Sequence, residues 1–351
     1  MPTTMKAVRK LTPGPGASLE TVHVPAPGPF DVLVKVKATS VCGTDYHIYS
    51  WDPWSQARIR PPLTMGHEFA GEVVAIGGQV TTHEVGDFVS AETHIVCGHC
   101  HQCLTGQYHV CQNTRILGVD TDGAFADYLA LPASNAWKND PDLPADVASM
   151  QEPLGNAVHT VLSVPIAGNT VAVTGCGPIG LMGIAVAKLA GAAAVYAVDV
   201  NDFRLDLARR MGADEIIDGR HEDVVAALRR YSGGSGVDVL LEFSGNATAI
   251  NQGLKAIRPG GKVAILGLPS RPVEIDLGND IVMKGVEVKG IAGRQMYDTW
   301  FKVKGLLRGG LDLRPLVTHR LPLEAYDEAM ELTRQGTCGK VVLYPQGVPQ
   351  S

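Results

Sequence analysis

The chain lacks both long hydrophobic runs and clusters of basic residues. Its most apolar stretch, GIAVAKLAGAAAVYAV, is interrupted by Lys188 and Gly191, so it falls short of the roughly 20 apolar residues that span a bilayer. The first residues, MPTTMKAVRK, contain no apolar signal-peptide segment. A net charge of −6 without a basic run does not favour nucleic-acid binding. We therefore expect a cytoplasmic protein whose partner is a small molecule and that binds neither membranes nor nucleic acid.

Compositional bias is also absent. We find no internal repeat and no low-complexity tract in the 351 residues. The 45% hydrophobic and 19% charged content and the 40 glycines are typical of a glycine-rich globular protein and exclude a disordered chain. At roughly 100–200 residues per domain, this length predicts about two domains.

The two parts of the chain differ in their periodicity. Residues Met5–Leu131 contain short strand-like runs separated by turns, which predicts a β-rich domain. After Pro153, helix-like stretches alternate with six strand candidates: TVAVTG, VYAVDV, EIID, VDVLLEFSG, KVAILG and VEVKGIAG. Six such units predict an α/β fold with a doubly wound parallel sheet. Two further helices, Tyr297–Arg308 and Leu323–Gln335, and a strand GKVVLYP are expected to return to the first domain.

A glycine motif follows the first strand of the α/β part. Gly175, Gly177 and Gly180 form G-x-G-x-x-G between a strand and a helix, which is typical of a turn that approaches a pyrophosphate. Asp199 ends the next strand, where a carboxylate accepts hydrogen bonds from ribose hydroxyls and repels a 2′-phosphate. This pattern predicts NAD rather than NADP. The alternative is a packing turn with an incidental aspartate, and Arg204 either contacts the adenosine or is solvated.

Four of the seven cysteines lie in VCGHCHQCLTGQYHVC, spaced C-x2-C-x2-C-x7-C. In a reducing cytoplasm such clusters are more often metal ligands than disulfides, and four thiolates suit tetrahedral zinc. Disulfides, free thiols and an iron–sulfur cluster are the alternatives; Gln112 stands where a ferredoxin-type cluster typically has proline. A four-sulfur shell is closed, so this zinc is expected to be structural. Its ligands are Cys97, Cys100, Cys103 and Cys111.

A second possible ligand set is spread along the chain. Cys42 lies in VCGTDYHIYS, His67 and Glu68 lie in MGHEFAGEV, and Glu152 lies in MQEPLGNAVHT. One thiolate, one imidazole and one carboxylate form a zinc set that leaves a position for water or substrate. Taken singly, Cys42 is explained as a buried packing residue and His67 as a core histidine. Their combination with a nucleotide-binding domain favours a catalytic centre.

GHEFAGEV, the four-cysteine segment and VTGCGPIG together resemble the zinc-containing medium-chain alcohol dehydrogenase superfamily over essentially the whole chain. CGTDYHIYSWDPWSQ, EPLGNAVHT and GIAGRQMYDTW more narrowly resemble its L-threonine 3-dehydrogenase family. The resemblance implies a GroES-like catalytic domain, residues 1–154 completed by 296–351, and a Rossmann NAD-binding domain, residues 155–295. It also implies a homotetramer that oxidises L-threonine to L-2-amino-3-oxobutanoate with NAD.

The resemblance further assigns roles to single residues. It implies that Cys42, His67 and Glu68 bind a catalytic zinc ion that stabilises the alkoxide of the substrate, and that Glu152 is a ligand or a proton carrier. Thr44 and His47 match a proton relay; their i, i+3 spacing places them on one face of a helical turn. Without the relay, Thr44 would cap that turn and His47 would simply be exposed.

The remaining expectations concern the two ligands. The expected cofactor contacts are Gly175, Gly177, Ile179, Gly180, Asp199, Arg204, Leu266, Gly267, Leu268, Ile291 and Ala292. Glu152 is expected near the ammonium group of threonine, and His94 or Arg294 near its carboxylate. Two other functions stay open: a related polyol or secondary-alcohol dehydrogenase, and a non-catalytic NAD-binding or zinc-scaffold protein.

Overall fold

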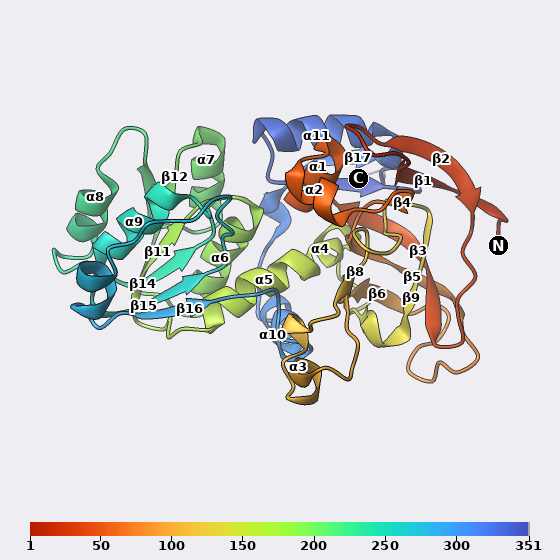
Figure 1. Ribbon diagram of the computed structural model, residues 1–351, viewed down its shortest axis with the longest axis horizontal. Helices are drawn as coiled ribbons and strands as arrows, with labels where there is room; N and C mark the ends of the chain where they lie inside the picture. The colour runs from red at the N-terminus through yellow and green to blue at the C-terminus, as the bar shows by residue number, and fades with distance from the viewer. Residues whose placement is uncertain (350–351) are drawn as a thin grey trace. The chain divides into compact units, whose positions relative to one another are not determined.

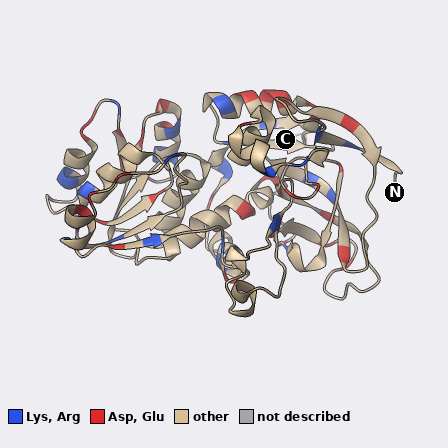
Figure 2. Cartoon of the chain, viewed as in Figure 1, with Lys and Arg blue, Asp and Glu red and all other residues tan. Residues whose placement is uncertain are grey.

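The computed structural model describes residues 1–349 and divides into two compact units. One unit comprises Met1–Glu152 together with the chain from Val317 onward, and the other comprises Pro153–Leu316. Both units are drawn in Figure 1, and each has its own sheet. In Figure 2, basic and acidic residues are interspersed along both units. Within the described residues, no helix combines the length and apolar character needed to cross a membrane.

The first unit is built on a seven-stranded sheet with the order β10-β6-β5-β3-β18-β17, in which β9 also pairs with β3. All of these pairs are antiparallel except β17 with β18. Valines of β3 and β5 pack with leucines of β9 in the core of this sheet. The strands are β3 (Asp31–Ser40), β5 (Glu68–Ile76), β6 (Phe88–Ala91), β9 (Tyr128–Pro132), β10 (Ala136–Lys138), β17 (Val317–Pro322) and β18 (Lys340–Tyr344).

Smaller elements surround this sheet. A three-stranded sheet contains β1 (Thr4–Lys10), β2 (Ser18–His23) and β4 (Leu63–Thr64), and a two-stranded sheet contains β7 (His94–Ile95) and β8 (Arg115–Ile116). The helices are α1 (Gly43–Ser50), α2 (Pro53–Arg58), α3 (His101–Leu104), α4 (Ala145–Ser149) and α11 (Tyr326–Gln335). Ile48 of α1 and Met330 of α11 are fully buried in one core cluster, which fixes α1 against the rest of the unit.

The second unit contains a six-stranded, fully parallel sheet with the order β13-β12-β11-β14-β15-β16. Its strands are β11 (Thr170–Thr174), β12 (Ala194–Asp199), β13 (Glu215–Asp218), β14 (Val237–Glu242), β15 (Ile257–Ile265) and β16 (Glu287–Gly290). Its helices are α6 (Pro178–Leu189), α7 (Asp202–Arg210), α8 (Val224–Tyr231), α9 (Ala247–Ala256) and α10 (Asp298–Arg308); α5 (Gln151–Leu162) begins at the unit boundary. The predicted doubly wound sheet is confirmed, and its order reverses at β11, which is where such folds bind ligands.

The return of the chain to the first unit occurs at Val317 rather than near residue 296. Helix α10 buries Trp300 and Val303 almost completely. Its charged Asp298 and Lys302 also act on His159 of α5, which lies in the same unit. Helical periodicity alone shows that α10 is amphipathic but does not identify the surface against which its apolar face packs.

Candidate catalytic and cofactor sites

Cys42, His67 and Glu68 converge in the first unit. Each offers one ligand atom, and these atoms all lie within 4.8 Å of one another. The register of β3 against β5 explains the convergence, because Ser40 lies opposite Glu68 and the chain continues from Ser40 into Cys42. Cys42 is also the N-cap residue of α1. Antiparallel pairing therefore brings Cys42 to the consecutive residues His67 and Glu68.

The chemistry of this cluster fits a bound cation. His67 Nδ1 and Glu68 Oε1 are buried and make no hydrogen bond. The Asp45 carboxylate lies 3.5 Å from His67 Nδ1, an arrangement that leaves Nε2 available as a metal ligand. Although burial opposes the imidazolium, the negative charges of Asp45 and Cys42 raise the pKa of His67 well above its ordinary value. One sulfur, one nitrogen and one carboxylate oxygen fit Zn²⁺ with a position left open.

The second oxygen of Glu68 is held by two residues that the sequence analysis missed. Ser40 Oγ and Lys340 Nζ both donate to Glu68 Oε2, and Lys340 Nζ also donates to the Val41 carbonyl at 3.0 Å. Burial raises the pKa of Glu68, while the charge of Lys340 opposes that rise. Burial likewise disfavours the Lys340 ammonium, but Glu68 raises its pKa above the ordinary value. Glu68 thus has one tethered oxygen, and its other oxygen remains available.

Glu152, Thr44 and His47 lie around this cluster. Glu152, in the first turn of α5, is buried, and its charge contributes to the raised pKa of Glu68. Thr44 Oγ1 lies 3.8 Å from Cys42 Sγ on α1. His47 stands one turn later on α1, with its side chain 56% exposed. The order Cys42, Thr44, His47 therefore leads from the buried cluster to solvent.

Cys97, Cys100, Cys103 and Cys111 form a second compact set. The Sγ–Sγ distances are 3.5 Å for Cys100–Cys103, 3.8 Å for Cys100–Cys111 and 3.5 Å for Cys97–Cys111. Four sulfurs held tetrahedrally at about 2.3 Å from zinc would be about 3.8 Å apart, so the spacing fits one ion. The His99 N–H and the Asn113 amide lower the pKa of Cys97 to about 5, which favours the thiolate. The described cysteines form no disulfide.

The glycine motif lies between β11 and α6 in the second unit. Gly175 has φ = 89°, and a Cβ there would lie 2.7 Å from the Ser244 nitrogen. A Cβ on Gly180 would lie 1.9 Å from the Gly175 carbonyl oxygen. Gly177, the N-cap residue of α6, has open space at the corresponding position. Close packing thus requires glycine at positions 175 and 180. Gly177 instead leaves open space beside the N-terminus of α6, where a phosphate group can bind.

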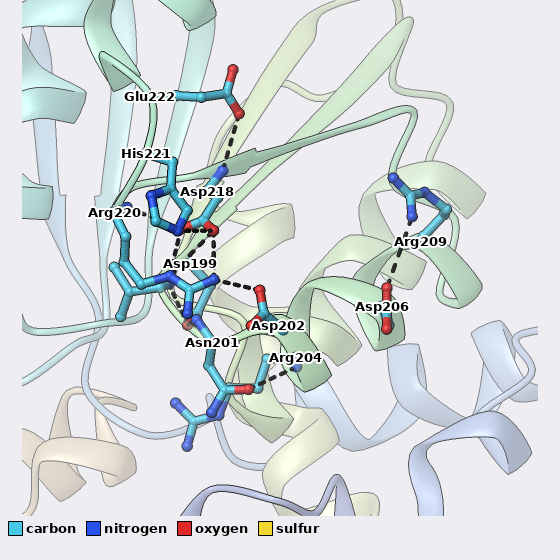
Figure 3. A network of polar contacts seen from close by, with 11 residues as sticks. Asp199, Asn201, Asp202, Arg204, Asp206, Arg209, Asp218, Arg220, His221 and Glu222 are labelled. Atoms are coloured by element: carbon cyan, nitrogen blue, oxygen red, sulfur yellow. Dashed lines mark hydrogen bonds and ion pairs between the residues drawn. The ribbon is translucent and has the colours of Figure 1, made fainter.

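Asp199 ends β12 at the edge of a cavity of about 460 Å³. Its Oδ2 accepts a hydrogen bond from the Cys176 N–H at 2.6 Å, and its Oδ1 accepts from the Val200 and Asn201 N–H groups. Asp199 and Asn201 are labelled in Figure 3. Since a carboxylate offers about four lone pairs, Asp199 can still accept from a ligand hydroxyl. Arg204, labelled in Figure 3, lines the same cavity, and its Nε is buried without a hydrogen bond.

The other predicted cofactor residues lie at the carboxyl ends of neighbouring strands. Leu266, Gly267 and Leu268 directly follow β15, and Ile291 and Ala292 directly follow β16. Gly267 is packed so closely that a Cβ would lie 2.2 Å from the Gly245 nitrogen. These five residues do not line the described cavity beside Asp199. Ile179 lies in the first turn of α6 and does not line that cavity either.

The two predicted carboxylate-binding residues have contacts in different units. His94, in β7, has Nδ1 3.8 Å from the Glu92 carboxylate. Arg294 is almost fully buried and donates from a terminal nitrogen to Asn156 Oδ1 at 3.2 Å. Its aliphatic stem packs on Gly155, where a Cβ would lie 2.5 Å from Arg294 Cδ. Both residues therefore have structural contacts, and their roles toward a substrate stay predictions.

Two family models match the chain: the zinc-binding dehydrogenase model matches residues 178–308, and the alcohol dehydrogenase GroES-like domain model matches residues 28–142. A protein named L-threonine 3-dehydrogenase from Symbiobacterium thermophilum is 58% identical over 347 residues, which cover 98% of this chain and 99% of that protein. The chain belongs to the zinc-binding dehydrogenase family. The predicted relationship to zinc-containing alcohol dehydrogenases is thereby confirmed.

Solved structures of other dehydrogenases agree with this membership. A zinc-binding dehydrogenase from Sinorhizobium meliloti, bound to NADP, has a TM-score of 0.90 and 32% identity, covering 98% of this chain and 100% of that chain. The 2R,3R-butanediol dehydrogenase from Bacillus subtilis has a TM-score of 0.89 and 32% identity, covering 97% of this chain and 100% of that chain.

Proposed function

We propose that this zinc-binding dehydrogenase oxidises the 3-hydroxyl of L-threonine to L-2-amino-3-oxobutanoate and transfers the hydride to NAD. The observation that carries this proposal is the 58% identity to an L-threonine 3-dehydrogenase over 98% of the chain. Relatives of the same name from Caldanaerobacter subterraneus and Pyrococcus horikoshii share 56% and 54% identity. The convergence of Cys42, His67 and Glu68 supports a catalytic rather than a scaffold role.

NAD is proposed as the cofactor because of Asp199. The negative charge of this buried carboxylate would repel the 2′-phosphate of NADP in the cavity beside Gly175 and Gly177. Arg204, in the same cavity, is proposed to contact the adenosine end. Residues that follow β15 and β16 are proposed to lie along the remainder of the cofactor, because the carboxyl ends of parallel strands bind ligands.

The proposed catalytic residues are Cys42, His67 and Glu68 as zinc ligands and Thr44 and His47 as the proton path. A zinc ion held there would supply a Lewis acid that lowers the pKa of the substrate hydroxyl. Thr44 would accept the hydroxyl proton while passing its own to His47, whose exposed ring exchanges protons with solvent. Buried Glu152 is proposed to face the substrate ammonium, and His94 or Arg294 its carboxylate. The four-cysteine segment is proposed to bind a structural zinc ion.

The proposed domains follow the two compact units: a catalytic domain of Met1–Glu152 with the chain from Val317 onward, and an NAD-binding domain of Pro153–Leu316, in place of the predicted bounds 1–154 with 296–351 and 155–295. A homotetramer and a cytoplasmic location are also proposed. The cytoplasmic location is supported by two features that are typical of reducing compartments: the described cysteines are all free, and four of them have the spacing of metal ligands.

The decisive test is NADH formation by the zinc-loaded protein with L-threonine, sorbitol, butane-2,3-diol or ethanol, repeated after chelation. We expect turnover with L-threonine that is lost on chelation and restored by zinc. The similarity to a butanediol dehydrogenase favours secondary-alcohol oxidation as the second candidate function. Turnover of butane-2,3-diol without turnover of L-threonine would reject the first candidate and support the second.

A further inference from the structure

The segment SWDPWSQ, which joins α1 to α2, has no role in the reaction as described so far. We propose that Asp52 in this segment is a positioning residue for proton transfer at His47. Its carboxylate holds the imidazole with a proton on Nδ1, which leaves the Nε2 lone pair to receive the proton that Thr44 releases. This inference rests on the proposed dehydrogenase function, since it assigns a role in that proton path.

Each carboxylate oxygen of Asp52 has its own hydrogen-bond partner. Oδ2 lies 2.7 Å from His47 Nδ1, and Oδ1 accepts the Ser55 N–H at 2.9 Å as the N-cap of α2. Although burial opposes the charge, hydrogen bonds from Ser55 and His47 hold the pKa of Asp52 below its ordinary range. Asp52 is therefore ionised at neutral pH and can only accept. The hydrogen bond then requires the proton on Nδ1 of His47.

The backbone between His47 and Asp52 adopts a conformation that serves this contact. Trp51 has φ = 59° and ψ = 46°, and it is the one non-glycine residue with positive φ in the part of the chain that the structure describes. Its N–H donates to the His47 carbonyl at 3.0 Å, so the chain turns back toward His47 directly before Asp52. A tryptophan in this left-handed conformation is strained, and the conformation persists only where surrounding contacts determine it.

Those contacts come from Lys10 and Gln56. Lys10 Nζ lies 5.0 Å from the centroid of the Trp51 ring and donates to the carbonyls of Gly14, Gly16 and Tyr49. Gln56 Nε2 donates to the Trp51 carbonyl at 2.9 Å. The Lys10 ammonium thus holds the Trp51 ring, and the Gln56 amide holds the Trp51 carbonyl. Trp51 and Gln56 therefore both help to hold Asp52 against His47.

Other charged groups near α1 are engaged elsewhere. On α11, Asp327 Oδ1 accepts from the Tyr49 hydroxyl at 2.8 Å. On α2, Arg58 pairs with Asp120 at 2.7 Å. On α1 itself, Asp45 accepts the Cys42 N–H at 2.9 Å and faces His67. Of these acidic side chains, only Asp52 contacts His47.

The test is Asp52→Asn in the zinc-loaded protein. Asparagine caps a helix as well as aspartate does, so Ser55 keeps its acceptor and the fold is retained. We expect ¹⁵N NMR of labelled histidines to show a loss of the Nδ1-protonated form of His47. We also expect kcat for L-threonine to fall about 10–100-fold, with KM for NAD changed less than about twofold. The loss is smaller than the roughly 10⁴-fold effect of the corresponding change in a serine protease because His47 is largely exposed.

Asp327→Asn is the matched control, because it neutralises a carboxylate that bonds to Tyr49 on the same helix. It should leave the His47 tautomer and kcat unchanged. Asp52→Glu should restore part of the lost kcat, because it restores the charge. An Asp52→Asn protein with the wild-type tautomer population, or with kcat within about twofold of wild type, would overturn the inference. Absence of L-threonine turnover in the wild-type protein would instead reject the proposed function, and the NMR measurement would still test the Asp52–His47 contact.

Discussion

At the scale of single residues, the proposed preference for NAD rests on the position of one carboxylate. Asp199 is buried at the end of β12 and accepts three backbone N–H groups, so its charge is held in place beside the cavity. Asp202, three residues later, pairs with Arg220 and has a side chain that is 78% exposed. The two aspartates carry the same charge, but only Asp199 is held in place beside the cavity.

We therefore expect Asp199→Ser to lower kcat/KM for NAD about 10–100-fold, which corresponds to about 1.5–3 kcal/mol for a charged hydrogen bond. The preference for NAD over NADP should shrink by at least the same factor, because repulsion of the 2′-phosphate is removed. Asp202→Ser, with its weakly held charge, should alter neither quantity by more than about twofold. The measurement is kcat/KM with each cofactor; an unchanged ratio in Asp199→Ser would show that Asp199 does not select the cofactor.

At the scale of elements, the four-cysteine segment has little regular structure, and its core consists mainly of cysteine side chains. Between Val96 and Cys111 its regular structure consists of one four-residue helix and one three-residue 3₁₀ turn. The core cluster of this segment contains Cys100, Cys103 and Cys111 with Val96 and Cys97 against them. Such a segment buries too little apolar surface to order itself, so a metal ion would supply most of its folding free energy.

Cys100→Ser is expected to lower the zinc content by about one ion per chain, because a structural site needs its four ligands. Limited proteolysis should then cleave the protein between residues 97 and 111, where the wild type is protected. Cys338→Ser, at a cysteine buried in a separate core cluster, is the control and should change neither zinc content nor cleavage. Equal protection of the Cys100→Ser segment would mean that protein contacts alone order it.

At the scale of the whole molecule, the first unit is closed by the last part of the chain. Strand β18 inserts between β3 and β17, and its first residue, Lys340, reaches Glu68, which lies 272 positions earlier. The side chains of Lys340 and Glu68 are 2% and 0% exposed. A buried ion pair contributes little when complete, but removing one partner leaves an uncompensated charge.

We expect Lys340→Met to lower the free energy of unfolding by about 3–5 kcal/mol, measured by denaturant titration. Adding Glu68→Gln to that variant should recover part of the loss, because no buried charge then remains. Lys37→Met breaks the exposed Lys37–Glu72 pair and should cost less than about 1 kcal/mol. A loss below about 1 kcal/mol in Lys340→Met would show that Glu68 does not depend on Lys340 for its charge.

The sequence predicted those features that depend on local pattern. The six parallel strands, the glycine turn before α6 and the four-cysteine segment each occupy one short stretch, so period and spacing suffice to identify them. The ligand set of Cys42, His67 and Glu68 was also predicted, although there the resemblance to a family was needed. Asp45 also carries a local signal, because an acidic residue at the third helical position after the N-cap, here Cys42, is typical of a capping box.

By itself, then, the sequence determined the fold class, the family and the types of ligand, because hydrophobic period, glycine spacing and donor chemistry are properties of short segments. Only the tertiary structure decided that Lys340 and Ser40 tether one oxygen of Glu68, that Asp52 turns back to His47, and that α10 remains in the second unit. Each of these depends on strand register, on a left-handed backbone turn or on the partner of an amphipathic face. Such features follow from contacts between distant residues, which no local pattern encodes.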